Sequence, residues 1–135
     1  MNREQKSAPA KDEFRLREAD QIITLFDLLQ SRLHACAVNK GWWEPERSVP
    51  ECLALIHSEV SEALEEYRRC GPGCPLQNTI SGENGKPEGL PIELADILIR
   101  VFDLAEALGI RLGIALLTKH GFNRTRSQRH GGKHC

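Results

Sequence analysis

The sequence predicts an all-α protein, a bundle of four to five helices. Apolar residues recur at three- and four-residue steps in four separate segments, which is the period of an amphipathic helix. No segment is rich in strand-forming residues, and the sequence shows no useful internal repeat. The chain has 135 residues, of which 40% are apolar, and this suits one domain with one core.

The first helix is expected from about Asp12 to Asn39, after a polar stretch, residues 1–11, that we expect to be disordered. Gly41 is expected to stop this helix. Its apolar stripe consists of Ile22, Leu25, Phe26, Leu29, Leu33 and Cys36. The domain is expected to span residues 12–125 and to be followed by a basic tail, residues 126–135.

The second helix has a clear start signal. Ser48 and Glu51 match a capping box, and Pro50 is tolerated in the first turn. Gly71 and Pro72 are expected to end the helix. Its buried stripe is predicted to be Leu53, Ile56, Val60, Ala63, Leu64 and Tyr67.

A connection rich in glycine and proline, residues 71–89, separates the second helix from the third. A loop of this length is often functional, and a short hairpin around residues 76–80 is one alternative. Pro91 opens the third helix and Gly109 ends it, while the fourth is expected from about Leu112 to Asn123. The apolar residues predicted to face inward are Leu94, Ile97, Leu98, Val101, Leu104, Ala105, Leu108, Ile114, Leu116 and Leu117.

Charge and composition exclude several classes of protein. Lys and Arg total 18 against 19 Asp and Glu, so stable nucleic-acid binding is not expected. No apolar run is long enough to span a membrane, and the N-terminus lacks the apolar core of a signal sequence. The five irregularly spaced cysteines predict free thiols and a cytoplasmic location.

Two pairs of acids carry the chemistry that the sequence predicts. Glu59 and Glu62 lie three residues apart on the second helix, as do Glu93 and Asp96 on the third. Residues at this spacing share one helix face. Antiparallel packing of the two helices would therefore form a nest of four carboxylates, which suits Mg²⁺ or Mn²⁺.

Other interpretations compete with this one. Exposed helices often carry Glu at such spacing, so the acids can simply be solvated. A di-iron site needs Glu-x-x-His on two helices, which this chain lacks, and Cys70 and Cys74 have no second pair with which to bind zinc. A non-enzymatic regulatory module, with a basic tail that contacts nucleic acid, is the alternative function.

Three motifs in this order resemble the MazG-like all-α nucleoside triphosphate pyrophosphohydrolases, in their compact single-domain branch. They are Glu59-x-x-Glu62, Glu93-x-x-Asp96, and Lys119 with Asn123 near the end of the next helix. The resemblance covers about residues 20–130. It implies Mg²⁺ held by the four acids and cleavage of a nucleoside triphosphate between its α- and β-phosphates, which releases a monophosphate and pyrophosphate. The implied role is nucleotide-pool adjustment or housecleaning.

The resemblance also implies the remaining parts of the site. The phosphate-binding candidates are Lys119, Asn123, Arg124 and Arg126. Trp42 and Trp43 are candidates for stacking on the base, although a tryptophan in a short connector is more often a core residue. Many relatives have Glu where this chain has Ser58, so the general base stays open. Guanine and pyrimidine deoxynucleotides are both allowed as substrates, and the resemblance implies a homo-oligomer, a dimer or tetramer.

Overall fold

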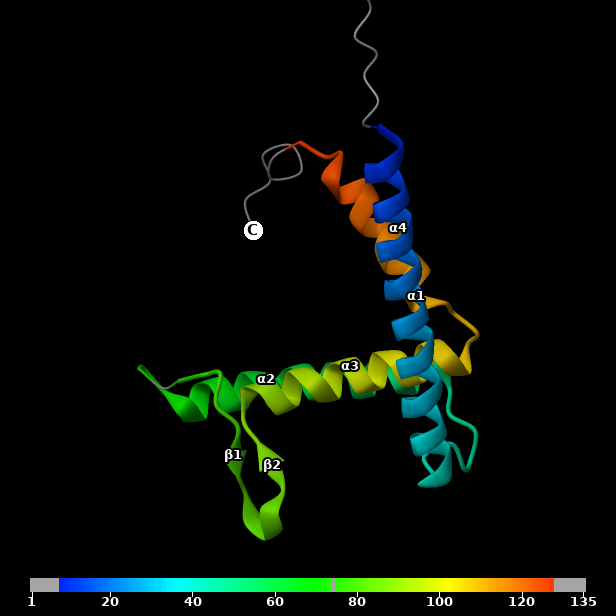
Figure 1. Ribbon diagram of the computed structural model, residues 1–135. Helices are drawn as coiled ribbons and strands as arrows, with labels where there is room; N and C mark the ends of the chain where they lie inside the picture. The colour runs from blue at the N-terminus through cyan, green and yellow to red at the C-terminus, as the bar shows by residue number, and fades with distance from the viewer. Residues whose placement is uncertain (1–7, 74, 128–135) are drawn as a thin grey trace, which may run out of the picture. The chain divides into compact units, whose positions relative to one another are not determined.

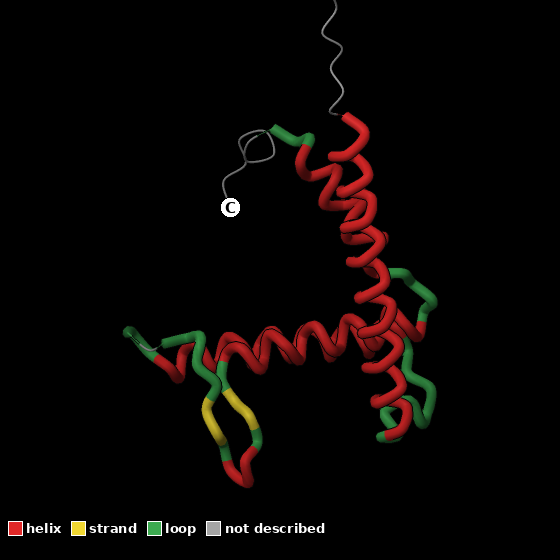
Figure 2. Tube along the Cα trace, in the orientation of Figure 1, coloured by secondary structure: helices red, strands yellow, loops and turns green. Residues whose placement is uncertain are grey.

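The computed structural model describes residues 8–73 and 75–127, with side chains from residue 17 onward, and it confirms the all-α class. The chain is 72% helical, with four helices and one short two-stranded sheet in the described part (Figure 1; Figure 2). It divides into two compact units, Met1–Leu29 with Ile110–Cys135, and Gln30–Gly109. The elements are α1 (Ala8–Asn39), α2 (Val49–Cys70), β1 (Ile80–Ser81), a 3₁₀ turn (Glu83–Gly85), β2 (Pro87–Glu88), α3 (Leu90–Ala107) and α4 (Leu112–Arg124).

The first unit pairs the N-terminal part of α1 with α4. Gly113 is buried where the two helices meet, and a Cβ atom at this position would lie 3.0 Å from Cβ of Phe26. Arg111 Nη2 lies 2.6 Å from Asp27 Oδ2 and links the start of α4 to α1. The helix α1 begins four residues before the expected start at Asp12, and the expectation of disorder for residues 1–7 lies outside the described part.

The second unit contains the end of α1 together with α2 and α3. The predicted capping box of α2 is present, because Ser48 Oγ accepts a hydrogen bond from the backbone N–H of Glu51 at 3.3 Å. Gly71 ends α2 with a φ of 72°, a left-handed conformation that glycine adopts without strain. Pro91 lies in the first turn of α3, as expected.

Helices α2 and α3 pack side by side and antiparallel, as Figure 1 shows by their colours along the chain. The hairpin β1–β2 lies between them in sequence and pairs Ile80 with Glu88 and Ser81 with Pro87. A hairpin around residues 76–80 was one expected alternative, whereas the strands form further along the chain. Arg69 Nη2 lies 3.7 Å from Glu88 Oε2 and connects the end of α2 to this hairpin.

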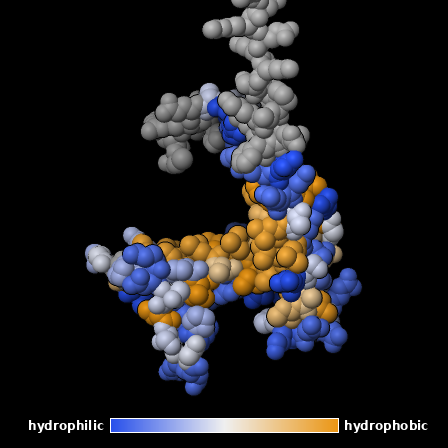
Figure 3. Space-filling model, in the orientation of Figure 1, coloured by the Kyte–Doolittle hydropathy of each residue, from blue (hydrophilic) through white to orange (hydrophobic). Residues whose placement is uncertain are grey.

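The predicted buried stripes are largely exposed, which corrects the sequence-based expectation. Among the described apolar side chains only Cys52, Ala63, Phe102 and Ala105 are buried. Leu64 and Leu98, predicted to be inside, are 47% and 57% exposed. Figure 3 shows apolar residues over much of the visible face of α2 and α3. Two packed helices can bury only the line between them, so their outer apolar faces stay open.

Two further expectations are tested by the described residues. Cys70 is disulfide-bonded, which corrects the expectation of free thiols at this position, while Cys36 and Cys52 are free. In the part of the chain that the structure describes, no helix combines the length and apolar character required to cross a membrane.

Candidate metal centre

Three of the four predicted acids converge between α2 and α3. Carboxylate oxygens of Glu59, Glu93 and Asp96 lie within 4.8 Å of one another. Glu59 and Glu93 are buried, with 7% and 8% of their surface exposed, and Asp96 is half-buried. Antiparallel packing brings three of the four predicted acids together, because Glu59, Glu93 and Asp96 lie on the sides of α2 and α3 that border each other.

The electrostatics of this cluster disfavour three free charges. Burial, followed by the negative charge of Glu62, raises the pKa of Glu93. Burial also raises the pKa of Asp96, with the charge of Glu59 as the next cause. A buried carboxylate beside other carboxylates gains stability by taking up a proton or by binding a cation.

Glu62, the fourth predicted acid, has a different environment. It is exposed and lies outside the group of three whose oxygens converge. Among the neighbouring charges, that of Glu62 nevertheless raises the pKa of Glu93 the most. Glu66, one turn further along α2, raises this pKa as well. Glu66 is also paired with Arg69 at 2.7 Å. The negative charge therefore extends along α2 beyond the three converging acids.

On α3, the basic residue next to the acidic cluster is Arg100. Its Nε donates a hydrogen bond to Glu59 Oε1 at 3.0 Å. Its positive charge also partly opposes the effects that raise the pKa of Asp96. Arg100 was not among the site residues predicted from the sequence. Its position four residues after Asp96, and therefore on the same helix face, was the signal that could have found it.

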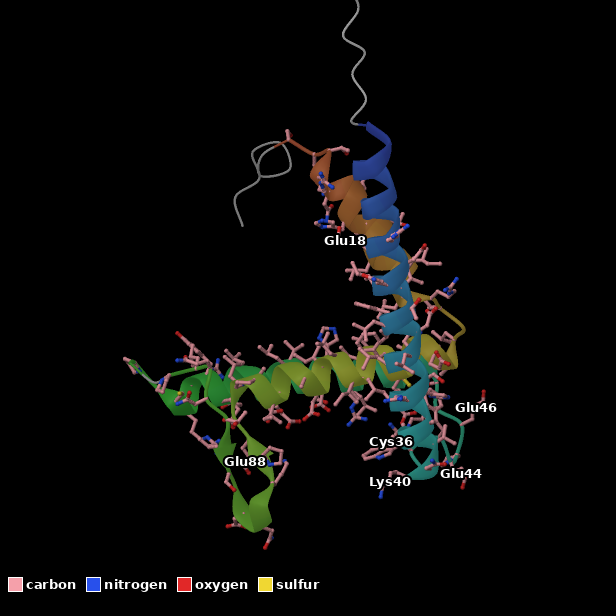
Figure 4. All side chains as sticks on the ribbon, viewed as in Figure 1. Glu18, Cys36, Lys40, Glu44, Glu46 and Glu88 are labelled. Atoms are coloured by element: carbon pink, nitrogen blue, oxygen red, sulfur yellow. The ribbon has the colours of Figure 1, made fainter. Side chains whose placement is uncertain are left out.

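A pocket of about 320 Å³ opens beside the acids within the second unit. Its walls combine Glu59 and Asp96 with the aromatic Trp42, and its two basic lining residues are Lys40 and Arg100. Figure 4 labels Lys40 together with Cys36, another lining residue, at the end of α1. The volume falls at the lower end of the range for small-molecule sites.

The two tryptophans have different environments. Trp43 is half-buried, and its Nε1 donates a hydrogen bond to Asp103 Oδ1 at 3.0 Å. The same oxygen lies 2.7 Å from Nδ1 of His34, whose ring meets Trp43 edge-on with centroids 5.3 Å apart. This arrangement favours a packing role for Trp43, which ties α1 to α3.

Trp42 is 46% exposed and lines the pocket. The guanidinium carbons of Arg47 and Arg100 lie 4.9 and 5.0 Å from the centroid of its ring. Cation–π contacts at this distance hold an indole in place while part of its surface remains accessible. Trp42 is therefore the better placed of the two candidates for stacking on a base.

The four phosphate-binding candidates belong to the first unit and are exposed. Lys119, Asn123 and Arg124 lie on α4, and Arg126 follows it. Lys119 Nζ and Arg126 Cζ lie 5.2 and 5.7 Å from the ring centroid of Phe122. Their role in phosphate binding stays a prediction, and the last part of the predicted basic tail, residues 128–135, lies outside the described residues.

The donor set fits a hard divalent cation. It consists of carboxylate oxygens from Glu59, Glu93 and Asp96, with no sulfur or imidazole ligand in this group. Oxygen-only sites suit Mg²⁺, Mn²⁺ or Ca²⁺ better than Zn²⁺. The acidic cluster can hold a metal ion. No family model, curated protein or solved structure matches this chain, so the site itself is the basis for an argument about function.

Proposed function

We propose that this protein is a Mg²⁺-dependent nucleoside triphosphate pyrophosphohydrolase, which releases a nucleoside monophosphate and pyrophosphate. The single observation that carries the proposal is the convergence of Glu59, Glu93 and Asp96 within 4.8 Å, with Glu59 and Asp96 lining a pocket that Trp42 also lines. A cation site and an aromatic surface in one pocket match the two ends of a nucleotide, its phosphates and its base.

The acids have the central role in this proposal. Glu59, Glu93 and Asp96 hold Mg²⁺, with Mn²⁺ as a possible substitute, and Glu62 adds negative charge beside Glu93. A bound Mg²⁺ neutralises phosphate charge and lowers the pKa of a bound water. The chain's own contribution is to orient the carboxylates and to keep them partly shielded from water, where their attraction for a cation is stronger.

The resemblance of the E-x-x-E and E-x-x-D motifs to the MazG-like enzymes supports this choice among the reactions of metal-bound nucleotides. Ser58 is exposed and hydrogen-bonded to the backbone oxygen of Leu55 at 2.8 Å, so it supplies no carboxylate base. The proposal accordingly assigns proton transfer to one of the clustered carboxylates. Glu93 and Asp96 are the better candidates, because burial raises the pKa of each in the metal-free protein.

The test is a phosphate-release assay over a panel of ribo- and deoxynucleoside triphosphates, with Mg²⁺ and with EDTA. Phosphate should appear only when inorganic pyrophosphatase is added, because the direct product is pyrophosphate. Release of phosphate without the added enzyme would indicate cleavage at the γ-phosphate and would contradict the proposal. The panel also identifies the preferred base, including guanine and pyrimidine deoxynucleotides.

Matched variants connect the activity to the site. Glu59→Gln and Asp96→Asn preserve shape and remove charge, so the proteins should fold while turnover falls to near background. Glu65→Gln is the control, because Glu65 lies on the same helix, is exposed and pairs with Arg68 at 2.8 Å. Normal turnover in Glu59→Gln and Asp96→Asn would show that the acids are not catalytic. A protein that hydrolyses no nucleotide and binds none would favour the regulatory-module alternative.

A further inference from the structure

Arg100 is a residue of the pocket whose contacts neither a metal site nor base stacking explains. Its guanidinium contacts two different parts of the pocket at once. Nε donates to Glu59 Oε1 at 3.0 Å, and Cζ lies 5.0 Å from the centroid of the Trp42 ring. The side chain is 25% exposed, so it is neither fully buried nor freely solvated.

Arg100 binds a carboxylate that a cation at the acidic cluster would also use. Glu59 Oε1 is engaged by the guanidinium, and Glu59 is one of the three acids whose oxygens converge. A guanidinium and a divalent cation both favour the same carboxylate, but they repel each other at short distance. Binding of a cation at Glu59 therefore weakens the contact between Arg100 and Glu59.

We propose that Arg100 is an exchangeable counter-ion of the acidic cluster, a role that rests on the proposed function. Without a cation its guanidinium neutralises Glu59, and with a cation bound it leaves Glu59 and binds a phosphate of the nucleotide. The exchange couples the two binding events, because Arg100 becomes available to bind phosphate only when the cation is in place.

The surroundings of Arg100 favour this second position. Asp96 and Arg100 lie one turn apart on α3 and both line the pocket, so a guanidinium that leaves Glu59 remains beside the cation site. The contact with the Trp42 ring holds it in the pocket. Arg suits bidentate contacts with phosphate, and Lys40 is the other basic residue that lines this pocket.

The first measurement is Mn²⁺ binding by calorimetry in the absence of nucleotide, with wild type, Arg100→Gln and Arg68→Gln. Arg68 is a matched control, because it forms an Arg–Glu pair of 2.8 Å on the exposed side of α2. Arg100→Gln should bind Mn²⁺ about tenfold more tightly, because the ion pair of Arg100 with Glu59 no longer competes with the metal. The partial exposure of this pair limits the gain to about this size. Arg68→Gln should match wild type.

The second measurement is binding of a non-hydrolysable nucleoside triphosphate analogue at saturating Mn²⁺. Here Arg100→Gln should bind about tenfold more weakly than wild type, because the phosphate ligand is lost. Arg100→Lys should recover part of this affinity, since it keeps the charge without the bidentate geometry. Opposite effects on the two ligands identify the exchange, because a merely structural role would weaken both or neither.

Three results would overturn the inference, in whole or in part. Weaker or unchanged Mn²⁺ binding in Arg100→Gln shows that Arg100 does not compete for Glu59. Unchanged analogue binding, with wild type binding normally, shows that Arg100 does not contact phosphate. A wild type that binds Mn²⁺ but no analogue overturns the proposed function together with the phosphate role, and the metal titration alone then decides whether Arg100 competes.

Discussion

Replacing Glu93 with Gln should stabilise the metal-free protein at neutral pH, which is unusual for a buried residue. Three carboxylate oxygens lie within 4.8 Å of one another, and Glu93 contributes one of them. Two unit charges at that distance repel by about 3.5 kcal/mol at an effective dielectric constant of 20. Glu93 has two such neighbours, so its own ionisation beside two charged carboxylates would cost at least about 7 kcal/mol at this dielectric constant.

Two features reduce this cost in the folded protein. Arg100 neutralises part of the charge on Glu59, and the raised pKa of Glu93 means that proton uptake relieves part of the rest. We therefore expect Glu93→Gln to gain about 1–3 kcal/mol, the fraction of the repulsion that survives these two effects. For a domain of this size that corresponds to an increase in Tm of roughly 4–12 °C.

The assay is thermal unfolding across pH, with and without Mg²⁺. A carboxyl whose folded-state pKa is raised adds stability below its unfolded-state pKa of about 4.3, and this stability is lost as the pH rises through the folded-state pKa. The advantage of Glu93→Gln should therefore be present at pH 7 and disappear below about pH 4. Glu65→Gln, an exposed control on α2, should differ little from wild type at any pH.

Addition of Mg²⁺ should remove or reverse the stability advantage of Glu93→Gln. At a hundred times its Kd, Mg²⁺ should stabilise wild type by about 2.7 kcal/mol, whereas Glu93→Gln should gain much less because it has lost a ligand. A Glu93→Gln protein that is less stable than wild type at pH 7 without metal would refute the reasoning. That result would mean that the Glu93 carboxylate has stabilising partners that outweigh the repulsion.

Three further predictions follow from the second unit and its surface. Asp103→Ala removes the acceptor shared by His34 and Trp43, so it should lower stability by about 2–4 kcal/mol in thermal unfolding; an unchanged Tm would show that these contacts do not stabilise the fold. Trp42→Ala should raise KM by a factor corresponding to about 1–3 kcal/mol of lost base stacking, while its Mn²⁺ affinity stays within a few-fold of wild type. Trp43→Ala should instead melt early and keep a normal KM in the folded fraction. The opposite pattern in steady-state kinetics would exchange the two assignments. Light scattering should find a dimer or tetramer, and Leu98→Glu, on the exposed apolar face of α3, should shift it toward the monomer; a wild-type mass of about 15 kDa at micromolar concentration would end this idea.

The helices and the pairing of acids could be predicted from the sequence because both are local properties. The start of α2 is determined by Ser48 and Glu51 and its end by Gly71, all of which act within a few residues along the chain. The three-residue spacing of Glu93 and Asp96 likewise places them on one helix face whatever surrounds them. For the element boundaries, local signals missed the start of α1 and the position of the hairpin.

The tertiary structure alone decided which side chains meet. Glu59 joins Glu93 and Asp96 while Glu62 remains exposed, because the rotation of α2 about its axis and its offset along α3 depend on contacts between segments about forty residues apart. The same packing brings Arg100 to Glu59. Hydrophobic periodicity identified the apolar faces of α2 and α3 correctly, but periodicity shows only that a face favours burial. Whether anything covers that face depends on tertiary or quaternary packing, which no local pattern encodes.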